Sequence, residues 1–172
     1  MARFSVRALR LRPGEEHRET LRLTLDPLVF GGEPYAFAPE EIPAELTVQR
    51  ATTGDVFRLA FRTRLEGPCM RCLAPAGLDL EVDAQEYDAI DPSDDDQLRS
   101  EYVVDSELDL SAWGRDLVAL SVPDQILCRP DCAGLCPTCG ANWNEGTCDC
   151  APDDDQRWSA LAGLQANRPK GR

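Results

Sequence analysis

The sequence lacks a long apolar run, and its 172 residues include a single histidine. No stretch approaches the roughly 18 consecutive apolar residues that a membrane-spanning helix needs. Arg3, Arg7 and Arg10 interrupt the N-terminal segment where a signal peptide would carry its apolar region. We therefore expect a cytoplasmic protein with no membrane partner.

The scarcity of histidine also bears on catalysis. His17 lies in a polar stretch, so we expect it at the surface, and no Cys–His or Ser–His pairing suited to nucleophilic catalysis is apparent. The sequence lacks the phosphate-binding pattern G-x-x-x-x-G-K-[ST] and the dinucleotide fingerprint G-x-G-x-x-G. We expect neither enzyme activity nor a small-molecule substrate.

Positive charge is scarce as well, since the formal net charge is -13 and Lys170 is the only lysine. We interpret the preference for arginine over lysine as the mark of a GC-rich genome rather than a choice for bidentate phosphate contacts. A strongly acidic chain is repelled by nucleic acid at long range. Contact with RNA would therefore need a local basic face or a basic protein partner.

Alternating apolar residues predict a β-rich N-terminal region. Leu21, Leu23 and Leu25 indicate a half-buried strand, and Leu46 with Val48 indicates a short one. Proline and glycine between residues 31 and 43 predict a loop. The clearest pattern is a long strand over residues 57–65 and a second over 78–84, which together predict an antiparallel hairpin with Cys69 and Cys72 near its tip.

Helical spacing appears later in the chain. Leu110, Trp113, Leu117 and Leu120 predict a helix with an apolar stripe, capped by Asp109 or Ser111 and ended by Pro123. The acidic run from residue 91 to 96 predicts a solvated linker. Asp153 to Asp155 predict the cap of a last short helix that carries Trp158, Leu161 and Leu164.

These elements predict an α+β fold with an antiparallel β-sheet core, a few short helices and a cysteine-rich, zinc-binding C-terminal subdomain. Residues 1–122 form the β-rich domain that includes the hairpin. Residues 123–165 form the cysteine-rich segment with the short C-terminal helix, and residues 166–172 form a disordered tail.

Eight cysteines predict metal binding. In a reducing compartment such thiols favour metal coordination over disulfides. They are Cys69, Cys72, Cys128, Cys132, Cys136, Cys139, Cys148 and Cys150. Two pairs have C-x-x-C spacing, which lets both thiolates of a tight turn face one ion, and Gly140 after the second pair suits the left-handed backbone of such a turn. Four thiolates make a closed, structural zinc site, so we expect one or two structural Zn²⁺ ions.

The spacing leaves the grouping of these ligands open. In one arrangement, Cys69 and Cys72 join Cys136 and Cys139, and the other four cysteines form the second site. In the other, the last four cysteines form a local ribbon, and Cys128 with Cys132 reaches back to the hairpin. A thiol redox function is the less favoured reading, because a redox C-x-x-C begins a helix, whereas the pair Cys69/Cys72 lies between two strands.

The motifs around the cysteines resemble those of a known family. C-x-R-C-L at residues 69–73 and C-x-x-x-C-x-G-L-C-P-x-C-G-x-N-x-N-x-x-x-C-x-C at residues 128–150 are similar to the YceD family, the large ribosomal RNA subunit accumulation proteins of bacteria. The resemblance extends from about Leu21 to Leu164. Trp143 departs from it, since the family usually has leucine there.

The resemblance implies a non-catalytic factor in ribosome biogenesis that promotes accumulation or processing of 23S ribosomal RNA during large-subunit assembly. The implied partners are large-subunit RNA or a pre-ribosomal particle. The gene of the family often neighbours that of a basic zinc-ribbon ribosomal protein, so an alternative role is that of an acidic, zinc-stabilised adaptor or chaperone for such a protein.

Four arginines form the candidate RNA-binding face. Arg58, Arg62 and Arg64 share the polar side of the long predicted strand, and Arg71 at the hairpin tip extends it. Such a basic patch suits contact with phosphate groups. An exposed strand face also needs polar residues for ordinary reasons of solubility, so both interpretations stay open from the sequence.

Overall fold

The computed structural model describes residues 3–90 and 98–150. The chain divides into two compact units, Met1–Cys132 and Ala133–Arg172. The acidic run at 91–96, the predicted C-terminal helix with Trp158, Leu161 and Leu164, and the predicted tail at 166–172 lie outside the described residues.

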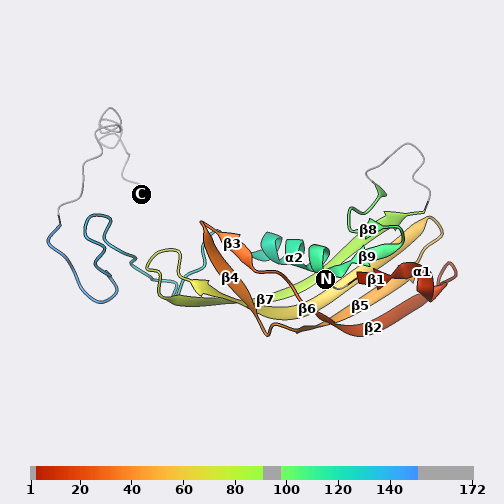
Figure 1. The fold of residues 1–172 in the computed structure, drawn as a ribbon, viewed down its shortest axis with the longest axis horizontal. Helices are drawn as coiled ribbons and strands as arrows, with labels where there is room; N and C mark the ends of the chain where they lie inside the picture. Colours follow the sequence, from red (N-terminus) through yellow and green to blue (C-terminus); the bar gives the residue numbers. More distant parts are fainter. Residues whose placement is uncertain (1–2, 91–97, 151–172) are drawn as a thin grey trace, which may run out of the picture. The chain divides into compact units, whose positions relative to one another are not determined.

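The first unit is built on an antiparallel sheet of six strands (Figure 1). Its strands are β2 (Glu16–Leu23), β3 (Leu28–Phe30), β4 (Glu33–Ala38), β5 (Ile42–Arg50), β6 (Gly54–Pro68) and β7 (Pro75–Ala89). The central strand is β6, which pairs with β7 along its full length on one edge and with β5 and then β4 on the other. This antiparallel sheet, with few and short helices, agrees with the predicted α+β fold class.

Strict alternation explains why β6 occupies the centre of this sheet. Phe57, Leu59 and Leu65 are fully buried, whereas Arg58 and Arg62 between them are exposed. One face of the strand therefore enters the core and the other stays solvated. The predicted long hairpin is confirmed, and its register from Gly54–Ala89 to Pro68–Pro75 places residues 69–74 at the tip.

One short helix covers the buried face of the sheet. Asp109 accepts a hydrogen bond from the Ala112 backbone N–H at 3.0 Å and caps α2 (Leu110–Ser121), as the sequence predicted. Trp113 is the largest buried side chain of the helix and packs in the main apolar core. The predicted stripe was wrong at Leu120, which is 84% exposed, because Gly114 and Val118 instead bring the helix onto the sheet.

The remaining elements form a small second sheet and a single helical turn. The strands of this second sheet are β1 (Arg3–Ser5), β9 (Glu107–Asp109) and β8 (Val103–Val104). The helical turn is α1 (Val6–Leu9), which follows β1. Among the residues described, no helix is both long and apolar enough to cross a membrane.

The expectation of a loop between residues 31 and 43 was wrong. The segment contains all of β4 and the start of β5. Tyr35 and Phe37 alternate into the core, while Pro34 lies in the outer pairing with β3, where a missing backbone N–H is tolerated. The prolines therefore concealed a strand in which only two alternating residues, Tyr35 and Phe37, are buried.

Candidate metal centre

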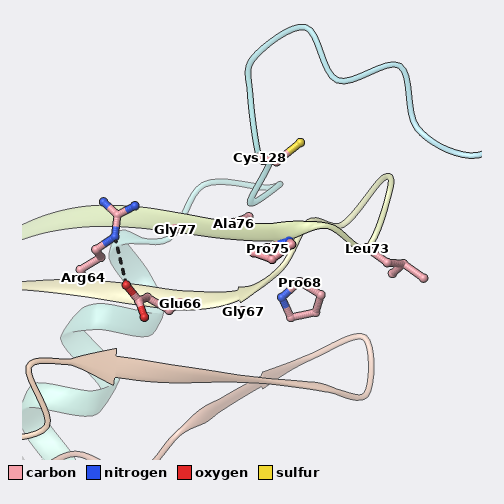
Figure 2. Close-up of a pocket in the computed structure, with 9 residues that line it drawn as sticks. All are labelled: Arg64, Glu66, Gly67, Pro68, Leu73, Pro75, Ala76, Gly77 and Cys128. Carbon is pink, nitrogen blue, oxygen red and sulfur yellow. Dashed lines mark ion pairs between the residues drawn. The ribbon is translucent and has the colours of Figure 1, made fainter. Parts of the chain in front are cut away.

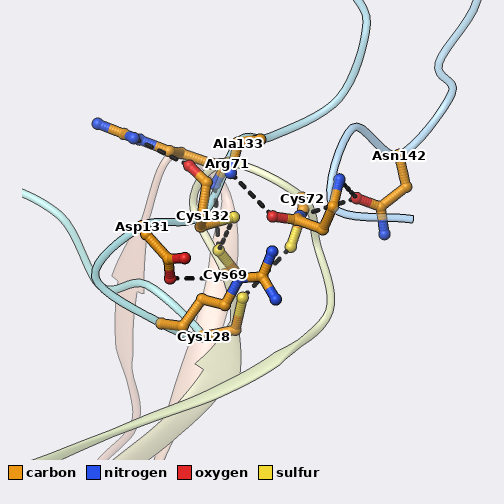
Figure 3. Close-up of polar contacts among 10 residues, drawn as sticks. Cys69, Arg71, Cys72, Cys128, Asp131, Cys132, Ala133 and Asn142 are labelled. Carbon is orange, nitrogen blue, oxygen red and sulfur yellow. Dashed lines mark hydrogen bonds and ion pairs between the residues drawn. The ribbon is translucent and has the colours of Figure 1, made fainter. Parts of the chain in front are cut away.

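Four cysteines meet at the tip of the β6–β7 hairpin. Cys69 and Cys72 come from the turn between the strands, and Cys128 and Cys132 come from the segment that follows α2. We call these four residues the first tetrad. Its four Sγ atoms lie within 4.8 Å of one another and face a common centre (Figure 3).

The spacing of these sulfur atoms suits a metal ion rather than disulfides. The Cys69 and Cys132 Sγ atoms are 3.8 Å apart, and the Cys72 and Cys128 Sγ atoms are 3.6 Å apart. A disulfide would bring two sulfurs to about 2.05 Å. A tetrahedral zinc ion with Zn–S bonds of about 2.3 Å holds its sulfurs roughly 3.8 Å apart.

The second unit carries a tetrad of its own. Cys136, Cys139, Cys148 and Cys150 bring their four Sγ atoms within 4.8 Å of one another, and we call them the second tetrad. The structure thus groups the eight cysteines by the second of the two arrangements that the sequence left open, with a local ribbon and a separate cluster at the hairpin.

The two C-x-x-C turns have the same hydrogen-bond frame. We call residues 69–74 the first knuckle and residues 136–141 the second. In the first, the Leu73 N–H donates to the Cys69 carbonyl at 3.0 Å, and the Cys69 N–H donates to the Ala74 carbonyl at 2.7 Å. In the second, the corresponding distances are 2.9 Å for Gly140 to Cys136 and 2.8 Å for Cys136 to Ala141.

The knuckle frame prepares the first cysteine of each pair for metal binding. Burial raises the pKa of Cys69, but hydrogen bonds from backbone N–H groups, led by that of Arg71, outweigh it and lower the pKa to about 6. Backbone N–H groups of Cys139 and Thr138 lower the pKa of Cys136 to about 6 in the same way. Each knuckle therefore supplies one thiolate near neutral pH.

One further thiol in each tetrad, Cys128 in the first and Cys150 in the second, holds its proton more strongly. Burial, followed by hydrogen bonding with Cys72, raises the pKa of Cys128 to about 12. Hydrogen bonding with Cys139, followed by burial, raises the pKa of Cys150 to about 12. Neighbouring thiolates repel one another, so all four ionise together only around a cation, and metal binding releases their protons.

A clasp of polar contacts joins the first knuckle to the segment that carries Cys128 and Cys132. The Arg71 guanidinium donates from Nε to the Gln125 side-chain oxygen at 3.0 Å. Its Nη1 donates to the Cys132 carbonyl at 3.0 Å (Figure 3). The Met70 N–H donates to the Ile126 carbonyl at 2.9 Å, and Ile126 is fully buried. These contacts bring the segment with Cys128 and Cys132 against the knuckle that carries Cys69 and Cys72.

Asparagines shape the second tetrad. The Trp143 N–H donates to the Gly134 carbonyl, and the Asn142 side-chain oxygen accepts from the Asn144 backbone N–H at 3.1 Å. The Trp143 indole N–H points to Cys148 Sγ at 3.5 Å. Trp143, which departs from the resembled family, thus contacts a ligand of the second tetrad, although 43% of its surface is exposed.

Three of the four arginines of the predicted RNA-binding face are paired with carboxylates. Hydrogen bonds link Arg58 to Asp83 at 2.7 Å, Arg62 to Glu81 at 2.7 Å and Arg64 to Asp79 at 2.8 Å. All three carboxylates belong to β7. The outward face of the hairpin is therefore a row of ion pairs. The acidic residues of β7 alternate in step with the arginines of β6, and this pattern in the sequence predicts the pairing.

Arg71 has a different environment from the other three arginines. Its guanidinium is engaged within the clasp described above, next to the first tetrad. Arg71 was predicted to extend the RNA-binding face because of its charge and its position at the hairpin tip. Its contacts with Gln125 and Cys132 depend on how a segment more than fifty residues away folds back.

Comparisons with known proteins give a consistent family. The family described as "Large ribosomal RNA subunit accumulation protein YceD" matches residues 57–165. An uncharacterised protein of Mycobacterium tuberculosis is 32% identical over 121 residues, which cover 68% of this chain and 58% of that protein. An uncharacterised protein of Mycobacterium bovis matches to the same extent. The chain thus spans less than two thirds of these relatives.

A plant protein carries the functional name. The "Large ribosomal RNA subunit accumulation protein YCED homolog 1, chloroplastic" of Zea mays is 43% identical over 61 residues, which cover 35% of this chain and 21% of that protein. No solved structure matches the chain.

Proposed function

We propose, because this chain belongs to the YceD family of large ribosomal RNA subunit accumulation proteins, that it is a non-catalytic cytoplasmic factor in large-subunit assembly. In this role it associates with a pre-ribosomal particle and promotes accumulation or processing of 23S ribosomal RNA. The family match over residues 57–165 is the observation that carries the proposal, and it spans both tetrads.

Each tetrad holds one structural Zn²⁺ ion in this proposal. The sulfur spacing and the all-thiolate donor set support it, since four thiolates satisfy a tetrahedral zinc ion and leave no position for a substrate. The ion in the first tetrad fastens the segment after α2 to the hairpin tip, and the ion in the second orders residues 136–150. Zinc here supplies folding free energy rather than chemistry.

Direct RNA contact through Arg58, Arg62 and Arg64 forms a second layer of the proposal. Their ion pairs are exposed, and exposed pairs contribute little to stability, so a phosphate group can replace the carboxylate at modest cost. The guanidinium fork suits phosphate as well as carboxylate. Arg71 contributes to the same surface only by holding the hairpin tip in place.

The paired carboxylates offer a sharp test of that contact. Asp79→Asn with Glu81→Gln and Asp83→Asn removes the competitors of phosphate and is expected to strengthen binding of large-subunit RNA in a gel shift. Charge reversal of the three arginines to glutamate is expected to weaken it. Equal RNA binding by both triple variants and the unchanged protein would rule out this face.

An acidic adaptor for a basic ribosomal protein is the second candidate. The net charge of -13 favours it, because it opposes RNA and attracts a cationic partner, and the ion pairs of the arginine face leave little free positive charge to offset this. A complex with a basic ribosomal protein that survives nuclease treatment and dissociates in high salt would support this candidate.

Depletion of the protein in its host tests the assembly role itself. We expect mature 23S RNA to fall relative to 16S RNA and precursor large-subunit particles to accumulate in sucrose gradients. The unchanged gene restores the ratio. A normal RNA ratio and normal particle profile after depletion would remove the proposed function.

A further inference from the structure

The two knuckles differ at one position despite their shared hydrogen-bond frame. The residue after the second cysteine has a left-handed backbone in both, with φ of +61° at Leu73 and +73° at Gly140. Glycine adopts this conformation freely, whereas a leucine there brings its Cβ against the backbone and loses free energy. The second knuckle uses the residue that the turn requires, and the first does not.

Burial does not repay the strain at Leu73. Its side chain is 63% exposed, so little apolar surface leaves water when the protein folds. At Gly140, among the described residues other than its chain neighbours, no heavy atom lies within 4 Å of the position that a Cβ would take. Folding alone therefore favours glycine at both positions.

Two hollows flank Leu73. One of about 310 Å³ is lined by Phe30, Tyr35, Pro68 and Met70, and the other of about 670 Å³ runs past Pro68 towards Cys128. Leu73 and Pro68 line both. Figure 2 shows Leu73 at the end of the hairpin turn, projecting from it beside Pro68. Val29 and Met70 add further exposed apolar surface at this end of the sheet.

The charges around the hollows favour a cationic protein segment. Glu33 lines the smaller hollow and Glu66 the larger. Arg64, which also lines the larger hollow, is hydrogen-bonded to Asp79. It also pairs with Glu66 at 3.5 Å (Figure 2). Cys69 lines the smaller hollow and Cys128 the larger, so the zinc ion proposed for the first tetrad, with its four thiolates, would add net negative charge beside both. Nucleic acid offers no aliphatic side chain to fill them.

We propose that the hairpin tip is a docking surface for a basic protein segment, with Leu73 as its apolar anchor. The hollow of about 310 Å³ accepts one large apolar side chain of the partner, and Glu33 and Glu66 attract its lysine and arginine residues. The strained leucine is retained for binding at the expense of stability. This inference rests on the proposed role in assembly, for which it names a class of partner and the surface that binds it.

Two substitutions separate binding from folding. Leu73→Gly and Leu73→Asn both relieve the left-handed strain, and each removes the anchor. We expect Leu73→Gly to raise the midpoint of thermal unfolding by about 1–3 °C. We expect both variants to reduce, at least tenfold, the amount of the basic partner that co-purifies with the protein. Leu120→Ala on α2, at another exposed leucine, is the matched control and retains the partner. A lowered midpoint in Leu73→Gly, or full partner recovery, would overturn the proposal.

Photocrosslinking identifies the partner. Benzoylphenylalanine replaces Leu73 in one strain and Leu120 in another, and the adducts formed in living cells are treated with nuclease or protease and identified by mass spectrometry. The proposal expects an adduct at position 73 to one protein with an excess of lysine and arginine, lost in high salt, and none at position 120. An adduct to RNA, to an acidic protein or within the chain itself would overturn it, as would no adduct.

The same cells keep the two proposals apart. If depletion leaves the large-subunit RNA unchanged while the basic adduct forms, the assembly role fails and the docking surface stands. If depletion lowers the RNA while the adduct is absent or is RNA, the assembly role stands and the docking surface fails.

Discussion

Arg71 makes the quantitative link between the hairpin tip and metal affinity. Its guanidinium donates to the Gln125 side chain and to the Cys132 carbonyl, both at 3.0 Å. In Arg71→Gln both contacts are lost. The contact with Gln125 is exposed and that with Cys132 is part-buried, so we assign about 1 kcal/mol to each, the middle of the range for ordinary hydrogen bonds and below that for hydrogen bonds to charged groups. The combined loss is about 2 kcal/mol.

This loss should appear as weaker zinc binding at the first tetrad. The clasp orders the segment with Cys128 and Cys132 before metal binds, and without it the binding event must supply that ordering. About 2 kcal/mol corresponds to roughly a 30-fold rise in the zinc dissociation constant, within the range found when other outer contacts of metal ligands are removed. Arg71→Lys keeps the charge but not the fork, so we expect roughly a fivefold rise.

The assay is zinc competition against a chromophoric chelator in a Cys148→Ser/Cys150→Ser background, which leaves the first tetrad as the only complete one. Arg115→Gln on α2 is the matched control, since Arg115 pairs with Asp116 and with none of the clasp residues. An affinity in Arg71→Gln within twofold of the background protein would refute the reasoning. An equal loss in Arg115→Gln would refute it as well.

Three further predictions concern other parts of the chain. A chelator removes metal from the second tetrad first, because more of its thiols are exposed; Trp143 fluorescence reports the loss through its contact with Cys148. Burial, followed by the Asp116 carboxylate, raises the pKa of Tyr102 to about 12. In the unfolded chain the same hydroxyl ionises near pH 10, so the free energy of unfolding falls as the pH rises from about 10 to 12. Tyr102→Phe makes this fall shallower. Trp113→Ala lowers the free energy of unfolding by about 3–5 kcal/mol in urea titrations, because the side chain is fully buried.

Each of these has an outcome that contradicts it. Metal loss from the first tetrad before the second, with Trp143→Phe as the fluorescence control, contradicts the order of release. An identical alkaline slope in Tyr102→Phe contradicts the role of that hydroxyl. A cost below about 1 kcal/mol for Trp113→Ala contradicts the placement of α2 on the sheet.

The extent of correct prediction follows the range of each interaction along the chain. The β6–β7 hairpin was predictable because alternation over fifteen residues and a tight turn are local properties. The cap at Asp109 was predictable for the same reason. The strand at Tyr35 and Phe37 was missed because the prolines outweighed a short apolar alternation, and Leu65, the partner of Phe37 on β6, lies nearly thirty residues later.

The grouping of cysteines and the role of Arg71 depend on contacts that the sequence does not display. Cys69 meets Cys132 only because the segment after α2 returns to the hairpin tip, where Ile126 enters the core. The arginine face had a similar difficulty, since the charge of Arg62 was visible but its pairing with Glu81 required the register of two strands. Leu73 became informative only when its φ could be compared with that of Gly140.

Native mass spectrometry of cysteine variants tests the central claim that the chain has two independent four-thiolate zinc sites. The unchanged protein should carry two zinc ions. Replacing Cys69, Cys72, Cys128 and Cys132 together with serine should remove one, and replacing Cys136, Cys139, Cys148 and Cys150 should remove the other. If either fourfold replacement removes both ions, or if the unchanged protein binds fewer than two, the account of two separate sites is contradicted.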